Sequence, residues 1–256
     1  GLGRRPAALA RIAQAGGGTV IAATGRHRDA HYPDGVSPVD GSDLRAVFLA
    51  ELIVGMAAQD EDYRTGRSVD AIARTEARAG LVKIGIDYWR ISRTEQAALE
   101  AAAAVCARTG SPLMVHTEYS SAVFAMLDIV TAHGLLADRV IVAHVDRNPD
   151  PGLHCEIAAA GAYLGYDGAA RYRAAPESVL IEALRRVVAA GYVERVLVGG
   201  DVARRSRYRA YGGLPGLDYL GRRYIPRLER ALSAEVLHTL CVSNPARVLG
   251  WLVASE

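Results

Sequence analysis

The sequence of 256 residues lacks several features that mark common classes of protein. It has no apolar run near the roughly 18 to 20 residues that cross a membrane, which excludes an integral membrane protein. Its net charge is only +2, from 30 basic and 28 acidic side chains, so it offers no long basic face for nucleic acid. It also contains no GxSxG, HExxH or nucleotide-binding glycine motif.

Cysteine is scarce, and Cys106, Cys155 and Cys241 lie far apart without any CxxC pair. This usage excludes a disulfide-rich secreted scaffold, so we expect three buried thiols in a reducing compartment and a cytoplasmic protein. The chain begins at Gly1 with no initiator methionine and no apolar targeting segment. We therefore expect the natural N-terminus to lie upstream.

Lysine is almost absent, because 29 of the 30 basic residues are arginine and the exception is Lys83. Lys83 lies inside the apolar run Leu81-Val82-Lys83-Ile84-Gly85, where a charged amine would have to lose its hydration. Lysine can be neutralised and used as a nucleophile or at a metal site, whereas arginine keeps its proton. The alternative is a lysine that extends from a strand end into solvent.

Short apolar runs alternate with amphipathic segments along the whole chain, which is typical of repeated βα units in one domain over residues 1–256. The predicted parallel strands are residues 19–24, 81–85, 112–116, 139–144, 162–166 and 195–200. The predicted helices are residues 4–15, 42–58, 92–109, 120–133, 149–160, 176–190, 218–232 and 244–253. Either a (β/α)8 TIM barrel that lacks its first two strands or a doubly wound sheet would fit this order.

Four residues able to bind metal or move protons stand at or near the carboxyl ends of these runs: Lys83, His116, His144 and Asp201. Their separations of 33, 28 and 57 residues fit one, one and two βα units. Because the carboxyl ends of parallel strands open into one mouth, we expect the four side chains to converge there. Imidazole and carboxylate are standard ligands of divalent ions, so the pattern predicts a metal site.

The motifs around these residues resemble the phosphotriesterase-like branch of the amidohydrolase superfamily, in matching order from about residue 1 to residue 251. They are Val82-Lys83-Ile84-Gly85, Val115-His116-Thr117-Glu118, Ala143-His144-Val145-Asp146, Gly199-Gly200-Asp201 and Ser243-Asn244-Pro245-Ala246. The resemblance implies a (β/α)8 barrel with two divalent metal ions, usually zinc, bridged by a carbamylated Lys83 and a hydroxide. It also implies that His116 and His144 hold one metal, while Asp201 contacts the other and acts as general base.

One part of the family pattern has no counterpart in this sequence. The His-x-His pair that ends the first strand in the family is missing, and His27 and His31 stand elsewhere and four residues apart. Since the missing pair coincides with the two missing strands, we interpret the chain as N-terminally incomplete.

The residues in the loops after the last two strands indicate the class of substrate. Within the family, Arg171, Arg205 and Tyr208 fall where members that open phosphorylated sugar lactones grip the phosphate. We therefore expect a lactonase with a small anionic substrate, and the sequence leaves room for a homodimer. The alternatives are an organophosphate or carboxyl esterase of the same family, a catalytically degenerate binding protein, and a metal-free Schiff-base aldolase that uses Lys83.

Two further features stay open at this stage. Glu118 fits either a residue that supports His116 or a surface glutamate at the start of a helix. Tyr88 and Trp89 fit either the lining of a pocket or aromatic packing under a loop.

Overall fold

The computed structural model describes residues 4–32, 41–59, 63, 68–171 and 175–252. Its centre is one parallel sheet of six strands that neighbour one another in chain order. A doubly wound sheet would reverse its strand order at a switch point, whereas a (β/α)8 barrel does not, so the observed order is that of the barrel. The strands are β1 (Ala23–Arg26), β2 (Leu81–Gly85), β3 (Leu113–His116), β4 (Val140–Ala143), β5 (Tyr163–Tyr166) and β6 (Val196–Val198).

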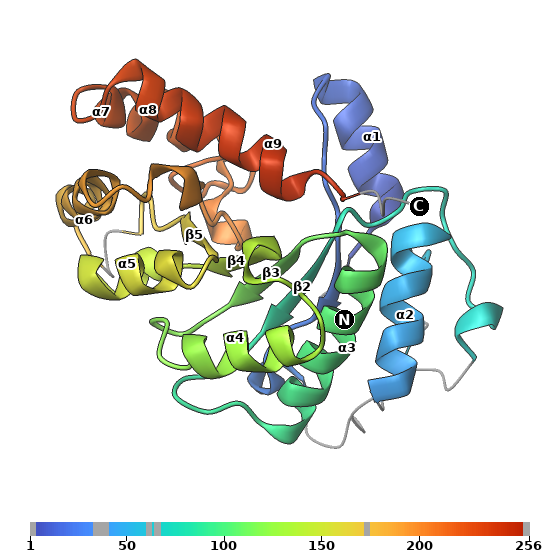
Figure 1. Cartoon of the computed structure of the whole chain (residues 1–256). Coiled ribbons are helices and arrows are strands. Elements are labelled where there is room, and N and C mark those ends of the chain that lie inside the picture. Colours follow the sequence, from blue (N-terminus) through green and yellow to red (C-terminus); the bar gives the residue numbers. More distant parts are fainter. Residues whose placement is uncertain (1–3, 33–40, 60–62, 64–67, 172–174, 253–256) are drawn as a thin grey trace.

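Helices cover the outer face of this sheet. Figure 1 shows α2 to α6 following one another around the strands, with α2 packed on α3, α3 on α4 and α5 on α6. They are α2 (Gly41–Ile53), α3 (Arg93–Thr109), α4 (Val123–Ala132), α5 (Pro151–Ala159) and α6 (Glu177–Ala189), while α1 (Pro6–Gly16) precedes β1 and buries only Pro6. The last part of the chain forms shorter helices, α7 (Ile225–Glu229), α8 (Ala234–His238) and α9 (Asn244–Leu249).

The sequence predicted most of these elements. The helix at residues 92–109 is confirmed with its capping box, in which Ser92 and Glu95 exchange side-chain-to-backbone hydrogen bonds. The first strand, predicted over residues 19–24, begins later, at Ala23. Val20 and Ile21 are nearly half exposed and strand pairing starts only at Ala23. The helix predicted over residues 218–232 is shorter and is followed by α8, whose start is capped by the Ser233 hydroxyl.

The core lies between the sheet and its helices. It joins strand residues such as Val82, Ile84 and Val115 to Phe48 of α2 and Leu99 of α3, all of them nearly inaccessible to solvent. Burial of each large side chain contributes about 1.5–3 kcal/mol to folding. This layer fixes the strand register and therefore the positions of the residues at the carboxyl ends.

The prediction of three buried thiols is correct for Cys106 only. Cys155 is partly exposed and Cys241 is exposed, because the turn that buries Leu240 points the next side chain outward. Among the residues that the structure describes, no helix has the length and apolar character needed to cross a membrane.

Candidate metal centre and active site

The four predicted residues occupy the carboxyl edge of the sheet. Lys83 lies in β2 and His116 ends β3, while His144 directly follows β4 and Asp201 stands three residues after the end of β6. The centroids of the His116 and His144 rings are 4.8 Å apart, and Nδ1 of His144 lies 3.8 Å from Oδ2 of Asp201. The Lys83 charge also lowers the pKa of both imidazoles, after the larger effect of burial. The fold therefore brings these side chains together at one edge of the sheet.

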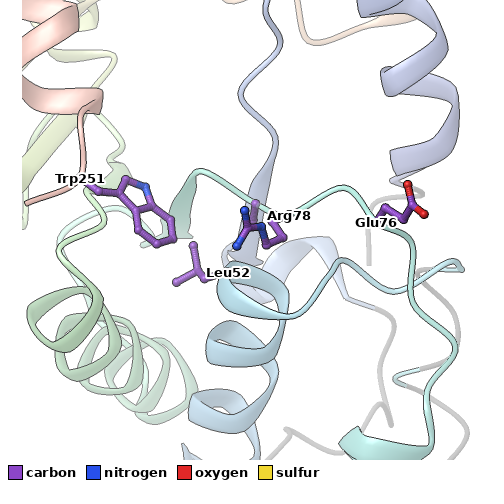
Figure 2. Close-up of a pocket in the computed structure, with 5 residues that line it drawn as sticks. Leu52, Glu76, Arg78 and Trp251 are labelled. Carbon is purple, nitrogen blue, oxygen red and sulfur yellow. The ribbon is translucent and has the colours of Figure 1, made fainter. Parts of the chain in front are cut away.

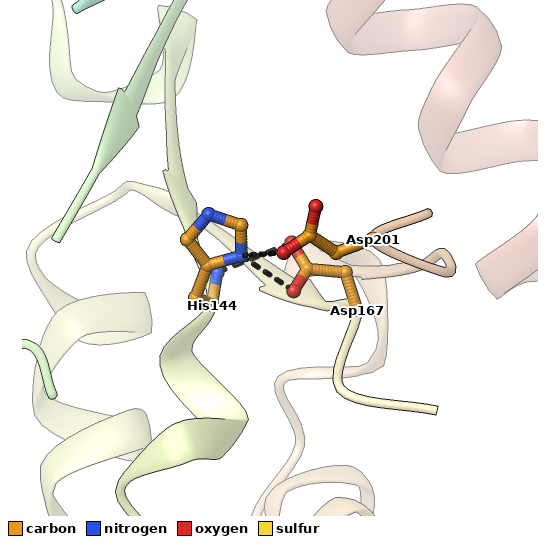
Figure 3. A group of neighbouring side chains, drawn as sticks. All are labelled: His144, Asp167 and Asp201. Atoms are coloured by element: carbon orange, nitrogen blue, oxygen red, sulfur yellow. Dashed lines mark hydrogen bonds and ion pairs between the residues drawn. The ribbon is translucent and has the colours of Figure 1, made fainter. Parts of the chain in front are cut away.

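A residue that the sequence analysis missed, Asp167, completes this group. Asp167 directly follows β5, and its Oδ1 lies 2.6 Å from Nδ1 of His144 while its Oδ2 accepts the His144 backbone N–H at 3.2 Å. His144 has a left-handed backbone with φ of 64°, a conformation that needs such support in a residue with a side chain. Figure 3 shows the His144 ring facing the Asp167 and Asp201 carboxylates.

These side chains fit a divalent metal ion. His144, Asp167 and Asp201 each offer one ligand atom, and these atoms lie within 4.8 Å of one another. Nε2 of His116 lies 3.1 Å from Oε1 of Glu118, so each ring has one nitrogen held by a carboxylate and the other nitrogen available. Carboxylate–histidine–metal arrangements of this kind fix the tautomer and orientation of metal-binding histidines. The Asp167 carboxylate could orient His144 or bind the ion itself.

Burial controls the protonation of the site. It lowers the pKa of His116 and of His144, so both imidazoles are held neutral, as metal ligation requires. Burial also lowers the pKa of Lys83 to about 8, with Arg147 adding to the effect and Asp167 opposing it. A lysine of this kind releases its proton far more readily than one at the surface.

His27 and His31 lie closer to this group than their sequence positions indicated. The centroid of the His27 ring is 4.8 Å from that of His116 and 4.2 Å from that of His31. Gly85 makes this approach possible, because a Cβ at that position would collide with the His27 ring. Burial, with the charges of His31 and Lys83, lowers the pKa of His27 to about 4. Neutral imidazoles therefore continue from His144 through His116 to the end of β1.

Arginine side chains surround Asp201. Arg171 forms an ion pair with its carboxylate, and Nη2 of Arg147 lies 3.4 Å from Oδ2. Arg207 donates to the Asp201 backbone carbonyl at 2.9 Å. Burial and the neighbouring guanidinium groups of Arg147 and Arg207 lower the pKa of Arg171 to about 10. Two guanidinium groups thus contact the Asp201 carboxylate and a third contacts its backbone carbonyl, which concentrates positive charge at this edge of the sheet.

The other two predicted substrate residues lie further out. Arg205 is exposed, and its guanidinium stacks over the Tyr211 ring at 4.6 Å. The Tyr208 hydroxyl donates to the Val202 carbonyl at 3.0 Å. Residues 172 and 173 of the preceding Arg-rich loop lie outside the described residues.

Tyr88 and Trp89 do not pack under a loop. They are 55% and 71% exposed, and Tyr88 lies edge-on to both Trp89 and Tyr119. The Ser121 hydroxyl accepts the Trp89 backbone N–H at 2.9 Å, which holds this aromatic group to the loop after β3.

One cavity lies away from this chemistry. It measures about 540 Å³ and is lined by Leu52, Glu76, Arg78, Ala79 and Trp251, where the chain approaches the amino end of β2 (Figure 2). The Trp251 indole closes one side by donating to the Gly80 carbonyl at 2.8 Å. The histidines and Asp201 lie at the opposite edge, so the cavity is not the site predicted from the sequence.

Known proteins resemble this chain in sequence and in fold. The model of the phosphotriesterase family matches residues 1–249. A phospho-furanose lactonase of Mycoplasmopsis synoviae (strain 53) is 30% identical over 245 residues, which are 92% of this chain and 68% of that protein. The crystal structure of an amidohydrolase from Mycoplasma synoviae gives a TM-score of 0.87 at 28% identity, covering 98% of this chain and 72% of the other.

A second solved structure is that of the phosphotriesterase homology protein from Escherichia coli, complexed with phosphate in its active site. It gives a TM-score of 0.84 at 27% identity and covers 96% of this chain and 80% of the other.

Proposed function

The chain belongs to the phosphotriesterase family and is a hydrolase, and we propose that it is a metal-dependent lactonase that opens a phosphorylated sugar lactone. The observation that carries the proposal is the convergence of His116, His144 and Asp201 at one edge of the sheet, with a carboxylate on each ring. Neutral imidazoles and carboxylates in this arrangement are donors for a hard or borderline divalent ion. Zinc is the metal that we expect.

His116, His144, Asp201 and Lys83 would hold the metal. When bound, a divalent ion polarises the lactone carbonyl and makes water more acidic. Lys83 would contribute as an anion: the lone pair of its neutral amine forms a bond to the carbon of carbon dioxide, and the nitrogen releases a proton to solvent. The product is a carbamate, and the lowered pKa of Lys83 favours the neutral amine that this step needs.

Asp201 would act on the proton of the attacking water. A carboxylate needs hydrogen-bond reach of that proton to act as general base. Arg147 and Arg171 contact the same carboxylate and hold it in place beside His144. Asp167 holds His144 through both the ring and the backbone N–H, which preserves its orientation during the reaction.

The arginines at the mouth support an anionic substrate. Arg171 lies beside Asp201, while Arg205 and Tyr208 follow on the next loop. Guanidinium forks bind phosphate in a bidentate manner. The relative from Mycoplasmopsis synoviae is named for a phosphorylated furanose lactone, and the E. coli relative holds phosphate in its active site. Both names support a phosphorylated lactone over a neutral organophosphate.

The experiment is a substrate screen with zinc-loaded protein and a matched Lys83→Ala variant. We expect ring opening to be fastest with phosphorylated sugar lactones and slower with their unphosphorylated forms. We expect Lys83→Ala to lose tight zinc binding and hydrolysis while keeping its circular dichroism spectrum.

Each alternative has its own outcome in the same screen. Faster cleavage of carboxyl esters or organophosphate triesters would replace the lactonase proposal with an esterase. Full zinc content and full activity in Lys83→Ala would remove the carbamate from the mechanism. Borohydride trapping of substrate on Lys83 without metal would indicate a Schiff-base enzyme, and a wild-type chain without metal or turnover would indicate a binding protein. The homodimer stays a prediction.

A further inference from the structure

Glu118 is a partly buried residue with several charge contacts rather than a surface glutamate. It lies two residues beyond the end of β3, and its side chain is only 16% exposed. Its Oε1 lies 3.1 Å from Nε2 of His116 and 2.7 Å from Arg28, and its Oε2 lies 3.3 Å from Arg147. Both carboxylate oxygens therefore have partners, which come from the end of β3, the loop after β1 and the turn after β4.

The contact with His116 matches the contact between Asp167 and His144. In each pair, a carboxylate holds one nitrogen of a strand-end histidine. Glu118 holds Nε2, which leaves Nδ1 as the nitrogen of His116 available to an ion. A carboxylate in this position fixes the ring orientation and raises the basicity of the free nitrogen.

Two arginines hold the Glu118 carboxylate in place. Arg28 comes from the loop after β1 and also contacts Asp87 at 3.3 Å, while Arg147 comes from the turn after β4. A buried carboxylate without partners is costly, and two guanidinium groups compensate this cost. The carboxylate is thus fixed from both sides of His116.

Arg147 extends the same contacts to the proposed general base. Its Nη1 reaches Glu118 and its Nη2 lies 3.4 Å from Oδ2 of Asp201. A continuous path of contacts therefore runs from His116 through Glu118 and Arg147 to Asp201. The path joins the loops after β3, β4 and β6. A substitution at Glu118 should therefore alter the positions of two proposed ligands, His116 and Asp201.

We propose that Glu118 is a positioning residue of the metal centre: it fixes the ring of His116 directly and the carboxylate of Asp201 through Arg147. This inference rests on the metal centre of the proposed function. It assigns Glu118 no contact with substrate. Its effect should therefore appear in metal binding before any substrate is added.

Two substitutions separate charge from hydrogen bonding. Glu118→Gln keeps an oxygen that can accept from His116 but loses the charge that binds both arginines. Glu118→Ala loses every contact. Removal of such an outer carboxylate costs roughly 10-fold to 100-fold in metal affinity, so we expect the Kd for zinc to rise about 10-fold in Glu118→Gln and about 100-fold in Glu118→Ala.

Glu100→Gln is the matched control. Glu100 also faces a histidine, with its Oε2 4.0 Å from Nε2 of His133, but both side chains are about one-third exposed and belong to the outer helices. The same change of charge there should leave the Kd for zinc at the wild-type value.

The experiment measures the Kd for zinc by competition with a chromophoric chelator, and the visible spectrum of each variant saturated with cobalt(II). A weaker Kd together with a shifted cobalt spectrum in the Glu118 variants, but not in Glu100→Gln, supports the inference, since loss of stability alone would leave that spectrum unchanged. Wild-type affinity and spectrum in Glu118→Gln and Glu118→Ala would overturn it and leave the proposed function standing.

The two failures are distinguishable. A wild-type chain that binds neither zinc nor cobalt would overturn the metal centre and this inference with it. If Glu118→Ala does not fold, as judged by circular dichroism, Glu118→Gln decides between the outcomes.

Discussion

Two arginines flank β4, and their guanidinium groups bind different kinds of partner. Arg139 lies just before the amino end of the strand, is 5% exposed, and donates to the backbone carbonyls of Gly110 at 2.9 Å and Gly250 at 2.7 Å. Arg147 lies just after the carboxyl end and joins the carboxylates of Glu118 and Asp201. One arginine thus binds neutral backbone and the other binds ionised side chains.

The difference shows how this fold separates stability from chemistry. The carbonyls that Arg139 binds terminate α3 and α9, so the arginine ties the last helix of the chain to the sheet. The carboxylates that Arg147 binds come from loops: Asp201 is itself a proposed ligand, and Glu118 contacts the proposed ligand His116. Amino-end residues of a (β/α)8 barrel stabilise, and carboxyl-end residues react. Substitutions at the two ends should therefore have separable effects.

The largest effect should come from Asp201→Asn at the carboxyl end. The amide cannot accept the proton from water, so we expect turnover to fall by about 10² or more, while bound zinc is retained. Turnover is measured on zinc-loaded protein with the best lactone of the screen. Asp218→Asn is the control, because the Asp218 carboxylate pairs with Arg209 and Arg222 and with none of the proposed metal ligands that the structure describes.

Near-wild-type turnover in Asp201→Asn would remove this residue from the mechanism. A large loss of stability in the same variant would instead show that carboxyl-end residues also determine the stability of the fold.

The next effect should come from Arg139→Met at the amino end. Methionine keeps much of the apolar volume but leaves the Gly110 and Gly250 carbonyls without their charged donor. Hydrogen bonds from charged groups contribute about 1.5–3 kcal/mol, so we expect the free energy of unfolding to fall by about 2–3 kcal/mol. Urea denaturation measures this as a lower midpoint with an unchanged slope.

Arg185→Met supplies the control for Arg139→Met. Arg185 is more than half exposed and pairs with Glu182 on the surface of α6, so its loss should change stability by less than about 0.5 kcal/mol. Zinc affinity should match the wild type in both variants. A zinc Kd that weakens along with the stability of Arg139→Met would contradict the division between the ends.

Most of the fold could be predicted from the sequence, because buried parallel strands and capped helices leave local patterns. The run from Leu81 to Gly85 is apolar apart from Lys83 and became β2 without change. The C-terminal helices were predicted less well, since π-helical turns at Leu220–Tyr224 and Thr239–Ser243 interrupt the usual period. The spacing of apolar residues in the sequence does not indicate where a π-helical turn forms.

The site was predicted where a strand end coincided with a known motif, and it was incomplete elsewhere. Asp167 also follows a strand directly, so the rule that found His116 could have found it. The places of Glu118 and Arg147 depend on the loops after three different strands, which only the tertiary structure brings together. The approach of His27 depends on the missing side chain at Gly85, a contact that no sequence spacing reveals.

A third buried histidine, His154, is structural, and its substitution has the smallest predicted effect. It is inaccessible to solvent, and both ring nitrogens are used within the protein: Nδ1 lies 2.6 Å from the Tyr166 hydroxyl, and Nε2 lies 2.8 Å from the Asn148 carbonyl. The Tyr166 hydroxyl donates to Nδ1, so the ring must stay neutral. Unlike His116 and His144, His154 has no nitrogen left for a metal, which makes its role structural.

Burial lowers the pKa of His154 below its ordinary value of 6.5. The unfolded chain therefore binds a proton at a higher pH than the folded chain does, and stability falls as the pH drops below about 6.5 towards the folded value. The contribution of one such group to the slope is at most about 1.4 kcal/mol per pH unit. His154→Gln should be less stable at pH 8 but should have a shallower loss between pH 6.5 and pH 5 than the wild type. Urea midpoints across this range test the prediction, with His133→Gln on the outer helix as control. Equal slopes of the unfolding free energy against pH in His154→Gln and the wild type would show that His154 does not govern acid stability.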